Sequence, residues 1–207
     1  MAPDIHPEPP DEMLVARIAD GDVDALGMLF RRCQQNVYRF ALHLSGSSSL
    51  ADDVTQDVFV TVIRDAAKFE AGRGTVPAWL CGIARNFVRR RLARDRGGAS
   101  VDVDEGVEAS LHAASPDPLD ALTSAESIEA LRRAVLSLPW RYREAVVLCD
   151  LQEMSYIDAA NALDCPVGTV RSRLNRGRAL LTEKMLTQQR RAARLSSGMD
   201  RVTRCLA

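Results

Sequence analysis

Apolar side chains recur at steps of three and four along most of this chain, the spacing of one face of an α-helix. In residues 23–45 they form one stripe, made of Leu26, Leu29, Phe30, Cys33, Val37, Phe40, Ala41 and Leu44. Gly46 and the serines after it end the stripe. No stretch of useful length alternates apolar and polar residues, as a half-buried strand would. The sequence therefore predicts an all-α fold.

Further helices are predicted on both sides of a segment that has the composition of a linker. Their expected positions are 50–67, 77–95, a helix from Leu122 to Leu138, then 139–151, 155–163 and 166–185. Pro77 and Pro139 suit the first turns of their helices. Residues 97–118 contain no Lys or Arg and are rich in Gly, Ala, Ser and Asp, which favours a flexible acidic linker.

This pattern divides the chain into two small helical domains with tails. We expect a disordered tail at 1–10, a first domain at 11–96, the linker at 97–118, a second domain at 119–186 and a basic tail at 187–207. In the second helix, Val54, Val58 and Val62 form the apolar stripe, with Phe59 and Ile63 beside it.

The net charge of −1 hides four blocks of alternating sign. Residues 1–70 and 97–126 are acidic, whereas 71–96 and 127–207 each carry a net charge of +6 when their charged residues are counted. Polyanion binding needs a local basic surface and not a basic total, so nucleic acid remains a possible ligand. Solvated helix faces are the plainer interpretation of such runs.

Several classes of function are disfavoured. No apolar run is long enough for a membrane span, and the acidic, Pro-rich N-terminus lacks a secretory signal, so no membrane insertion and a cytoplasmic location are expected. Five cysteines without a CxxC pair and three scattered histidines predict buried thiols, with no metal site and no cofactor. No phosphate loop, nucleophile elbow or His-centred cluster indicates an enzyme.

Residues 154–181 carry the most informative pattern, that of a helix-turn-helix. Ser155 and Asp158 resemble a capping box, and Ile157, Ala160 and Leu163 share one face of the first helix. A short turn follows, and Pro166 opens the second helix, whose buried stripe is Val167, Val170, Leu174, Gly177 and Leu181.

The opposite face of the second helix suits DNA recognition. Arg pairs with guanine edges and Asn with adenine edges in the major groove, and neighbouring polar groups contact phosphates. The predicted DNA-binding residues of this helix are Thr169, Arg171, Ser172, Asn175, Arg176 and Arg178. An ordinary amphipathic surface helix is the alternative, which the short turn and the unpaired arginines disfavour.

Three segments in order resemble the extracytoplasmic-function sigma factors of the sigma-70 family. Residues 138–181, from LPWRYREAVVL to CPVGTVRSRL, are similar to the family's domain for the upstream (−35) promoter element. Residues 49–69 resemble its polymerase-binding helix, and residues 76–94 its promoter-melting helix at the downstream (−10) element.

The resemblance implies roles for further residues. Asp53, Gln56, Asp57 and Phe59 would bind the clamp helices of core RNA polymerase. Gly72, Arg73 and Gly74 with Asn86 would shape a pocket for a flipped base. The implied −10 residues are Arg73, Arg85, Asn86, Arg89 and Arg90.

The resemblance also implies partners and a function. The partners are core RNA polymerase, promoter DNA and an anti-sigma factor. The function would be promoter-specific transcription initiation without catalysis by the chain itself. A stand-alone helix-turn-helix regulator is the alternative, which the second domain alone would allow.

Overall fold

The computed structural model describes residues 8–95 and 124–205, with side chains described up to residue 188 except those of 124–127. Every regular element within these residues is helical, so the all-α prediction is confirmed there. The predicted linker 97–118 lies outside the described residues. The helices of the first half are α1 (Asp11–Ala19), α2 (Val23–Ser45), α3 (Ser48–Asp65) and α4 (Val76–Asp95), with short 3-10 turns at Ala66–Lys68 (η1) and Ala71–Arg73 (η2).

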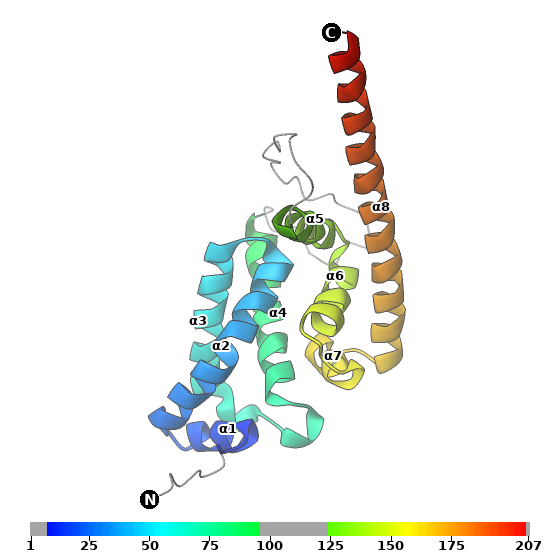
Figure 1. The fold of residues 1–207 in the computed structure, drawn as a ribbon. Helices are drawn as coiled ribbons and strands as arrows, with labels where there is room; N and C mark the ends of the chain where they lie inside the picture. The colour runs from blue at the N-terminus through cyan, green and yellow to red at the C-terminus, as the bar shows by residue number, and fades with distance from the viewer. Residues whose placement is uncertain (1–7, 96–123, 206–207) are drawn as a thin grey trace, which may run out of the picture.

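The first half is a bundle of α2, α3 and α4, closed at one end by α1 (Figure 1). Local signals set its turns. Asp22 caps α2 by accepting a hydrogen bond from the Ala25 backbone N–H at 3.0 Å, and Gly46 ends α2 in the left-handed conformation. Ser47 then caps α3 by accepting from the Leu50 N–H. These caps explain why the predicted bounds of α2 match the observed ones.

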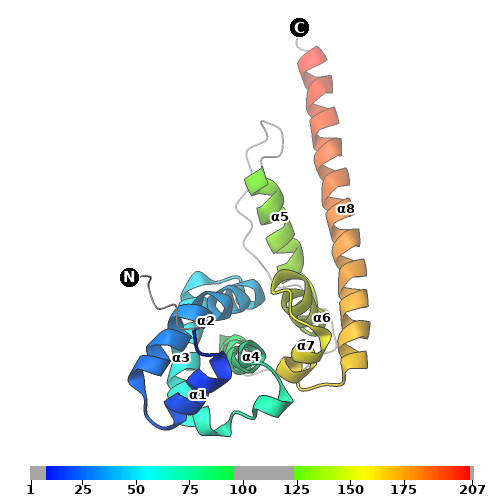
Figure 2. The same cartoon turned by 60° about the horizontal axis from the view of Figure 1, so that its bottom comes forward.

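The second half holds the helix-turn-helix. Its elements are α5 (Ser124–Leu136), α6 (Trp140–Val146), the π-helical turn η3 (Val147–Leu151), α7 (Tyr156–Leu163) and α8 (Val167–Cys205). The predicted helix 139–151 is thus divided into α6 and η3. The backbone of α8 continues 20 residues past the predicted end at 185 and projects beyond α5 (Figures 1 and 2).

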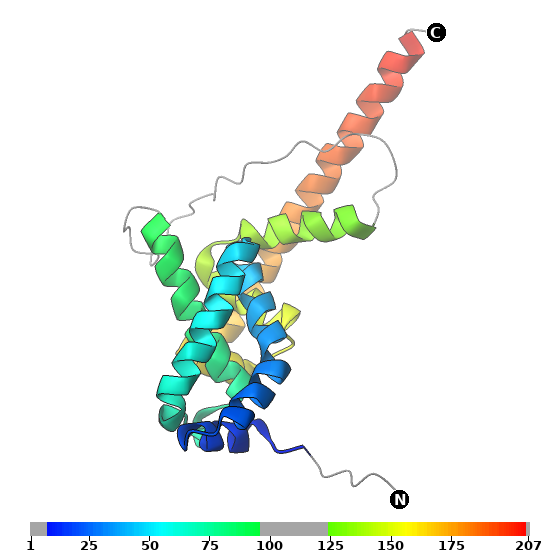
Figure 3. The same cartoon turned by 90° about the vertical axis from the view of Figure 1, so that its left-hand side faces the viewer.

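The two halves pack against each other. α4 lies against α7, and α5 crosses the end of α2 (Figure 3). One hydrophobic core includes residues of both halves, such as Leu80 and Ala84 of α4 with Ala159 and Leu163 of α7.

Some predicted faces differ from the observed ones. Ile157 was placed on the apolar face of its helix and Ile63 beside the stripe of α3, yet these side chains are 66% and 57% exposed. Residues 8–10 of the predicted tail lie against α2, where Arg32 donates to the Pro9 carbonyl at 2.7 Å. Apolar spacing identifies a helix, but the elements that pack against the helix decide how wide a face of it is buried.

Candidate nucleic-acid interfaces

The helix-turn-helix consists of α7, a turn at residues 164–166 and the start of α8. The Ser155 hydroxyl accepts the Asp158 backbone N–H at 3.1 Å and donates to the Asp158 carboxylate at 2.6 Å, so the predicted N-terminal cap is formed. Asp164 ends α7 in the left-handed conformation with φ of 49°. Asp tolerates this conformation better than most residues, which explains the tight turn.

The inner face of α8 docks on α6. Val170 and Leu174 are buried, and Gly177 lies so close to α6 that an added Cβ would stand 2.7 Å from Val146 Cγ2. The buried stripe was therefore predicted correctly at these three positions. It orients the opposite face of the helix toward solvent.

The outer face of α8 presents the predicted −35 residues. The five exposed ones are Arg171, Ser172, Asn175, Arg176 and Arg178. Thr169 is half-buried, and its carbonyl accepts a hydrogen bond from the Ser172 hydroxyl at 3.0 Å. The structure thus brings all six together on one helix.

These arginines are not unpaired, contrary to the sequence interpretation. Arg178 forms an ion pair with Asp150 of η3 at 2.6 Å. Arg171 lies over the Tyr156 ring, 5.7 Å from its centroid. The Arg176 guanidinium beside the Tyr142 hydroxyl lowers the pKa of that phenol. Contacts between residues this far apart in the sequence have no local signal.

The predicted −10 residues lie on α4 and on the turn before it. Asn86 and Arg90 are exposed, whereas Arg85 and Arg89 are half-buried. Arg73 is exposed on η2, where its guanidinium lies 3.6 Å from the Glu70 carboxylate.

A groove of about 550 Å³ runs between α4 and α7 and includes Arg85, Asn86 and Arg89 in its lining. Gly72, Arg73 and Gly74 are not part of that lining. A Cβ on Gly74 would instead stand 2.7 Å from the side chain of Asn161, so Gly74 packs against α7. The base pocket of these glycines with Asn86 stays a prediction.

Sequence reasoning missed Glu144, which holds Arg85. The Glu144 side chain is 1% exposed, and the Arg85 guanidinium donates to both of its carboxylate oxygens. Burial raises the pKa of the Glu144 carboxyl, while the Arg85 charge acts in the opposite direction. The partners are 59 residues apart, so spacing could not have revealed the pair.

The predicted polymerase-binding residues lie on α3. Asp53 and Gln56 are exposed and Asp57 is half-buried; Arg91 of α4 bridges the two carboxylates at 3.3 and 3.2 Å. Phe59 is only 5% exposed, and its ring packs edge-on against Phe30 at 4.8 Å. In this conformation Phe59 belongs to the core and has little surface to offer a partner.

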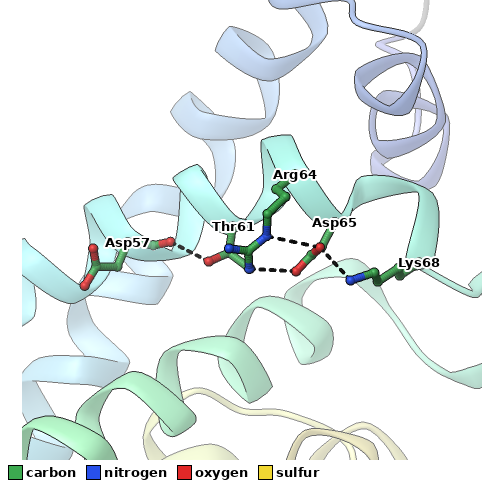
Figure 4. Close-up of polar contacts among 5 residues, drawn as sticks. All are labelled: Asp57, Thr61, Arg64, Asp65 and Lys68. Carbon is green, nitrogen blue, oxygen red and sulfur yellow. Dashed lines mark hydrogen bonds and ion pairs between the residues drawn. The ribbon is translucent and has the colours of Figure 1, made fainter.

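Farther along α3, two apolar residues and an ionic cluster are exposed. Val60 is 64% and Ile63 57% exposed, which sequence periodicity did not anticipate. In the next turn Arg64 and Lys68 both donate to Asp65 (Figure 4) and hold the pKa of that carboxyl at about 2. Figure 4 also shows the Thr61 hydroxyl donating to the Asp57 backbone carbonyl one turn earlier in α3.

Cysteine and metal chemistry find little support in the described residues. Cys33 and Cys81 are buried, and burial raises the pKa of their thiols to about 11 and about 12. Thiols so rarely ionised are poor nucleophiles and ligands. Within residues 8–95 and 124–205, no three His, Cys, Asp or Glu side chains gather where they could hold a metal ion. No described helix is both long and apolar enough to cross a bilayer.

Comparisons with known proteins agree with this geometry. Residues 29–97 match the family model of Sigma-70 region 2, and residues 128–181 match that of Sigma-70, region 4. The first range contains the face of α3 and the basic helix α4, and the second contains the helix-turn-helix. The matches define the class, that of sigma-70 transcription factors.

Similar proteins narrow the class. The chain is 34% identical over 185 residues to the ECF RNA polymerase sigma factor SigE of Mycolicibacterium smegmatis, covering 85% of this chain and 69% of the relative. It is 33% identical to the ECF RNA polymerase sigma-E factor of Escherichia coli, covering 84% and 94%. The chain belongs to the extracytoplasmic-function (ECF) family of RNA polymerase sigma factors.

Solved structures support the same fold. CnrH in complex with the cytosolic domain of CnrY superimposes with a TM-score of 0.64 at 26% identity, covering 86% of this chain and 97% of CnrH. The sigma factor RpoE of Bartonella quintana, in complex with the anti-sigma factor NepR, gives 0.61 at 29% identity and 79% and 98% coverage.

Family membership also settles the function. As a sigma factor, the protein binds core RNA polymerase and promoter DNA and directs transcription initiation. The alternative of a stand-alone regulator is not favoured, because both sigma-70 regions are matched in one chain.

Proposed function

We propose that two separate basic surfaces of this sigma factor read one promoter. The outer face of α8 takes the −35 element, with Arg171, Asn175 and Arg176 as base-reading candidates and Thr169, Ser172 and Arg178 in supporting contacts. The basic face of α4 binds the −10 element. Its contacting residues are Arg85, Asn86, Arg89 and Arg90, together with Arg73 on the turn before the helix. The domain limits 11–96 and 119–186 follow from the same division.

One observation carries the −35 assignment. Arg171, Asn175 and Arg176 are all exposed on a helix whose opposite side is docked through Val170, Leu174 and Gly177. A helix held in this way presents a rigid polar face of the width that enters a major groove.

The polymerase contact belongs to α3. Asp53, Gln56 and Asp57 form its polar part, and exposed Val60 and Ile63 extend it with apolar surface. Phe59 supports this face from below, since its ring lies in the core against Phe30. A mixed acidic and apolar patch on a rigid helix suits a protein interface better than a nucleic acid.

A protein inhibitor is a further expected partner. The similar RpoE structure contains the anti-sigma factor NepR, and the CnrH structure contains the cytosolic domain of CnrY. We infer that this chain has a partner of the same kind, and that the protein acts by binding and not by catalysis.

The assignment of α3 is tested by binding to purified core RNA polymerase. The double variant Asp53→Asn/Asp57→Asn should bind core enzyme roughly fivefold more weakly, about 1 kcal/mol, because exposed charge pairs contribute amounts of this order. The control Glu183→Gln neutralises an exposed acid on α8 and should bind like the wild type. Equal affinity of all three proteins would refute the role of these acids.

A further inference from the structure

Arg178 of α8 is held by two hydrogen bonds to one carboxylate. Its Nε donates to Asp150 Oδ2 at 3.1 Å, and its Nη2 donates to Asp150 Oδ1 at 2.6 Å. Two parallel hydrogen bonds fix the plane of the guanidinium, which a single bond would leave free to rotate. The pair therefore sets the direction in which the rest of the arginine head points.

Asp150 stands on a rigid support. It lies in the π-helical turn η3, where the preceding residues Val147 and Leu148 are fully buried. The Gln152 backbone N–H closes the turn by donating to the Val147 carbonyl at 2.9 Å. π-Helical turns are rare in proteins and occur often at functional sites. Because the backbone under Asp150 is fixed, its carboxylate holds Arg178 at a defined place beside α8.

The pair is too exposed to contribute much to folding. The Arg178 side chain is 52% and the Asp150 side chain 28% exposed, and ion pairs near the surface stabilise a fold only slightly. Arg178 nevertheless loses side-chain freedom by forming the pair. A long side chain that is restrained before a partner arrives loses less entropy on binding. The arrangement therefore suits a role in binding better than a role in stability.

The pair leaves one nitrogen of the guanidinium for another partner. Arginine carries N–H donors on Nε, Nη1 and Nη2, and the pair with Asp150 uses Nε and Nη2. Arg178 also shares a face of α8 with Arg171 and Asn175, at steps of four and three residues. Nη1 can thus donate to a phosphate oxygen at the edge of this face while Asp150 is still bound.

We propose that Asp150 is a positioning residue for promoter binding, which orients Arg178 so that Nη1 donates to a phosphate beside the −35 element. The inference rests on the proposed placement of α8 on that element. Asp150 itself contacts neither base nor phosphate and acts through the arginine. A direct effect of its charge on DNA would have the opposite sign, because a carboxylate repels phosphates.

Binding of the holoenzyme to a cognate promoter fragment tests the role. Asp150→Asn keeps the shape of the side chain but removes the charge that accepts both hydrogen bonds, so Arg178 becomes mobile. Affinity should fall roughly three- to tenfold, the cost of ordering one long side chain at an interface. Random DNA at the same salt concentration should show the same fold loss, because a phosphate contact carries no sequence information. Unchanged or tighter binding would overturn the positioning role.

The matched control is Glu153→Gln, which removes the same charge from an exposed side chain three residues further along the chain. This variant should bind DNA at least as tightly as the wild type. Equal losses in Asp150→Asn and Glu153→Gln would overturn the inference. Urea unfolding should give nearly the same stability for Asp150→Asn and wild type, which separates a loss of affinity from a loss of fold.

A double-mutant cycle with Arg178→Ala shows whether Asp150 acts through the arginine. Arg178→Ala should itself weaken binding to both DNAs and reduce the slope of log affinity against log salt by about 1. In this background Asp150→Asn should cause no further loss, whereas a loss of the same size with and without Arg178 would overturn the positioning role.

The cycle also separates this inference from the proposed function. Arg178→Ala binding like the wild type would refute the DNA contact of Arg178 itself, and the positioning role with it. A clear loss with Arg178→Ala but none with Asp150→Asn would refute the positioning role alone.

Discussion

At the scale of the residue, the arginines of α8 differ in how firmly the fold holds them. Arg178 is restrained by Asp150, and Arg171 lies over Tyr156. Arg176 is exposed beside the phenol of Tyr142, an uncharged neighbour. Because no carboxylate has to be released, Arg176, like Arg171, can turn to a base at a lower free-energy cost than Arg178.

Arg176→Ala should therefore weaken holoenzyme binding to a cognate promoter by roughly 1–3 kcal/mol, the range for one bidentate base contact. The measurement is a titration against promoter and random DNA at one fixed salt concentration. Arg132→Ala, an exposed arginine of α5, serves as the control. Equal losses on both DNAs would show that Arg176 contacts phosphate instead.

Asp65 predicts an acid-sensitive contribution to stability. Hydrogen bonds from Arg64 and Lys68 lower its pKa from an ordinary 3.8 to about 2 in the folded protein. Because the folded pKa lies below the unfolded one, the contribution is complete above about pH 4 and is lost as the pH falls through about 2. Asp65→Asn should thus lower the free energy of unfolding at pH 6, and by much less at pH 2.

Urea unfolding of Asp65→Asn and wild type across this pH range checks the prediction. High salt should reduce the difference between them, since the ionic partners are partly exposed and therefore screened. A difference that is independent of pH would mean that Asp65 acts by packing and not by charge.

At the scale of the element, the sequence predicted the positions of the helices better than their lengths and their buried faces. The bounds of α2 were anticipated because Asp22 and Gly46 are local stop signals. The end of α8 was missed because no proline or cap marks it, and Leu195, Met199 and Val202 continue the helical spacing past residue 186. Ile157 was placed on an apolar face and Ile63 beside an apolar stripe, but both side chains are exposed.

The docking of α8 depends on the absence of a side chain at Gly177. Gly177→Ala should destabilise the second half by roughly 1–3 kcal/mol, because the added Cβ would meet Val146 Cγ2 at 2.7 Å and the Tyr142 carbonyl at 3.2 Å. Replacing glycine by alanine in a helix interior by itself stabilises the helix by about 1 kcal/mol. The cost of the clash is expected to exceed this gain.

Chemical denaturation of the full chain measures the effect. Gly168→Ala is the matched control on the same helix, since nothing lies within 4 Å of its added Cβ. It should be neutral or slightly stabilising. If Gly177→Ala behaved like Gly168→Ala, the close approach of α8 to α6 would be wrong.

At the scale of the whole molecule, the described halves share one core. Leu80 and Ala84 of the first half belong to the same buried cluster as Ala159 and Leu163 of the second. The net charge of −1 likewise conceals two basic surfaces, on α4 and on α8. Function on DNA therefore depends on how the halves are arranged, and not only on what each contains.

A shared core predicts cooperative unfolding. The wild type should show one calorimetric transition whose van't Hoff and calorimetric enthalpies agree, because neither half can unfold without exposing the other. Gly82→Leu should divide the transition into two, because a Cβ on Gly82 of α4 would stand only 3.3 Å from the Ala162 carbonyl oxygen of α7. Two separate transitions in the wild type would show that the halves are energetically independent.

The sequence alone determined the helices, the two basic helices and the helix-turn-helix, because apolar spacing, caps and turn residues act within a few positions. It also placed Arg171, Asn175 and Arg176 correctly on the exposed face of α8. Each of these properties belongs to a single element or to a short turn.

Only the tertiary structure decided what those elements cover. The pairing of Arg85 with Glu144, the burial of Phe59 and the exposure of Ile157 depend on helices distant in the chain. A periodic pattern indicates that one face of a helix is apolar. It does not show which helix packs against that face or which charged side chains that helix carries. The basic face of α4, which we propose binds the −10 element, was therefore visible in the sequence, whereas its contact with α7 was not.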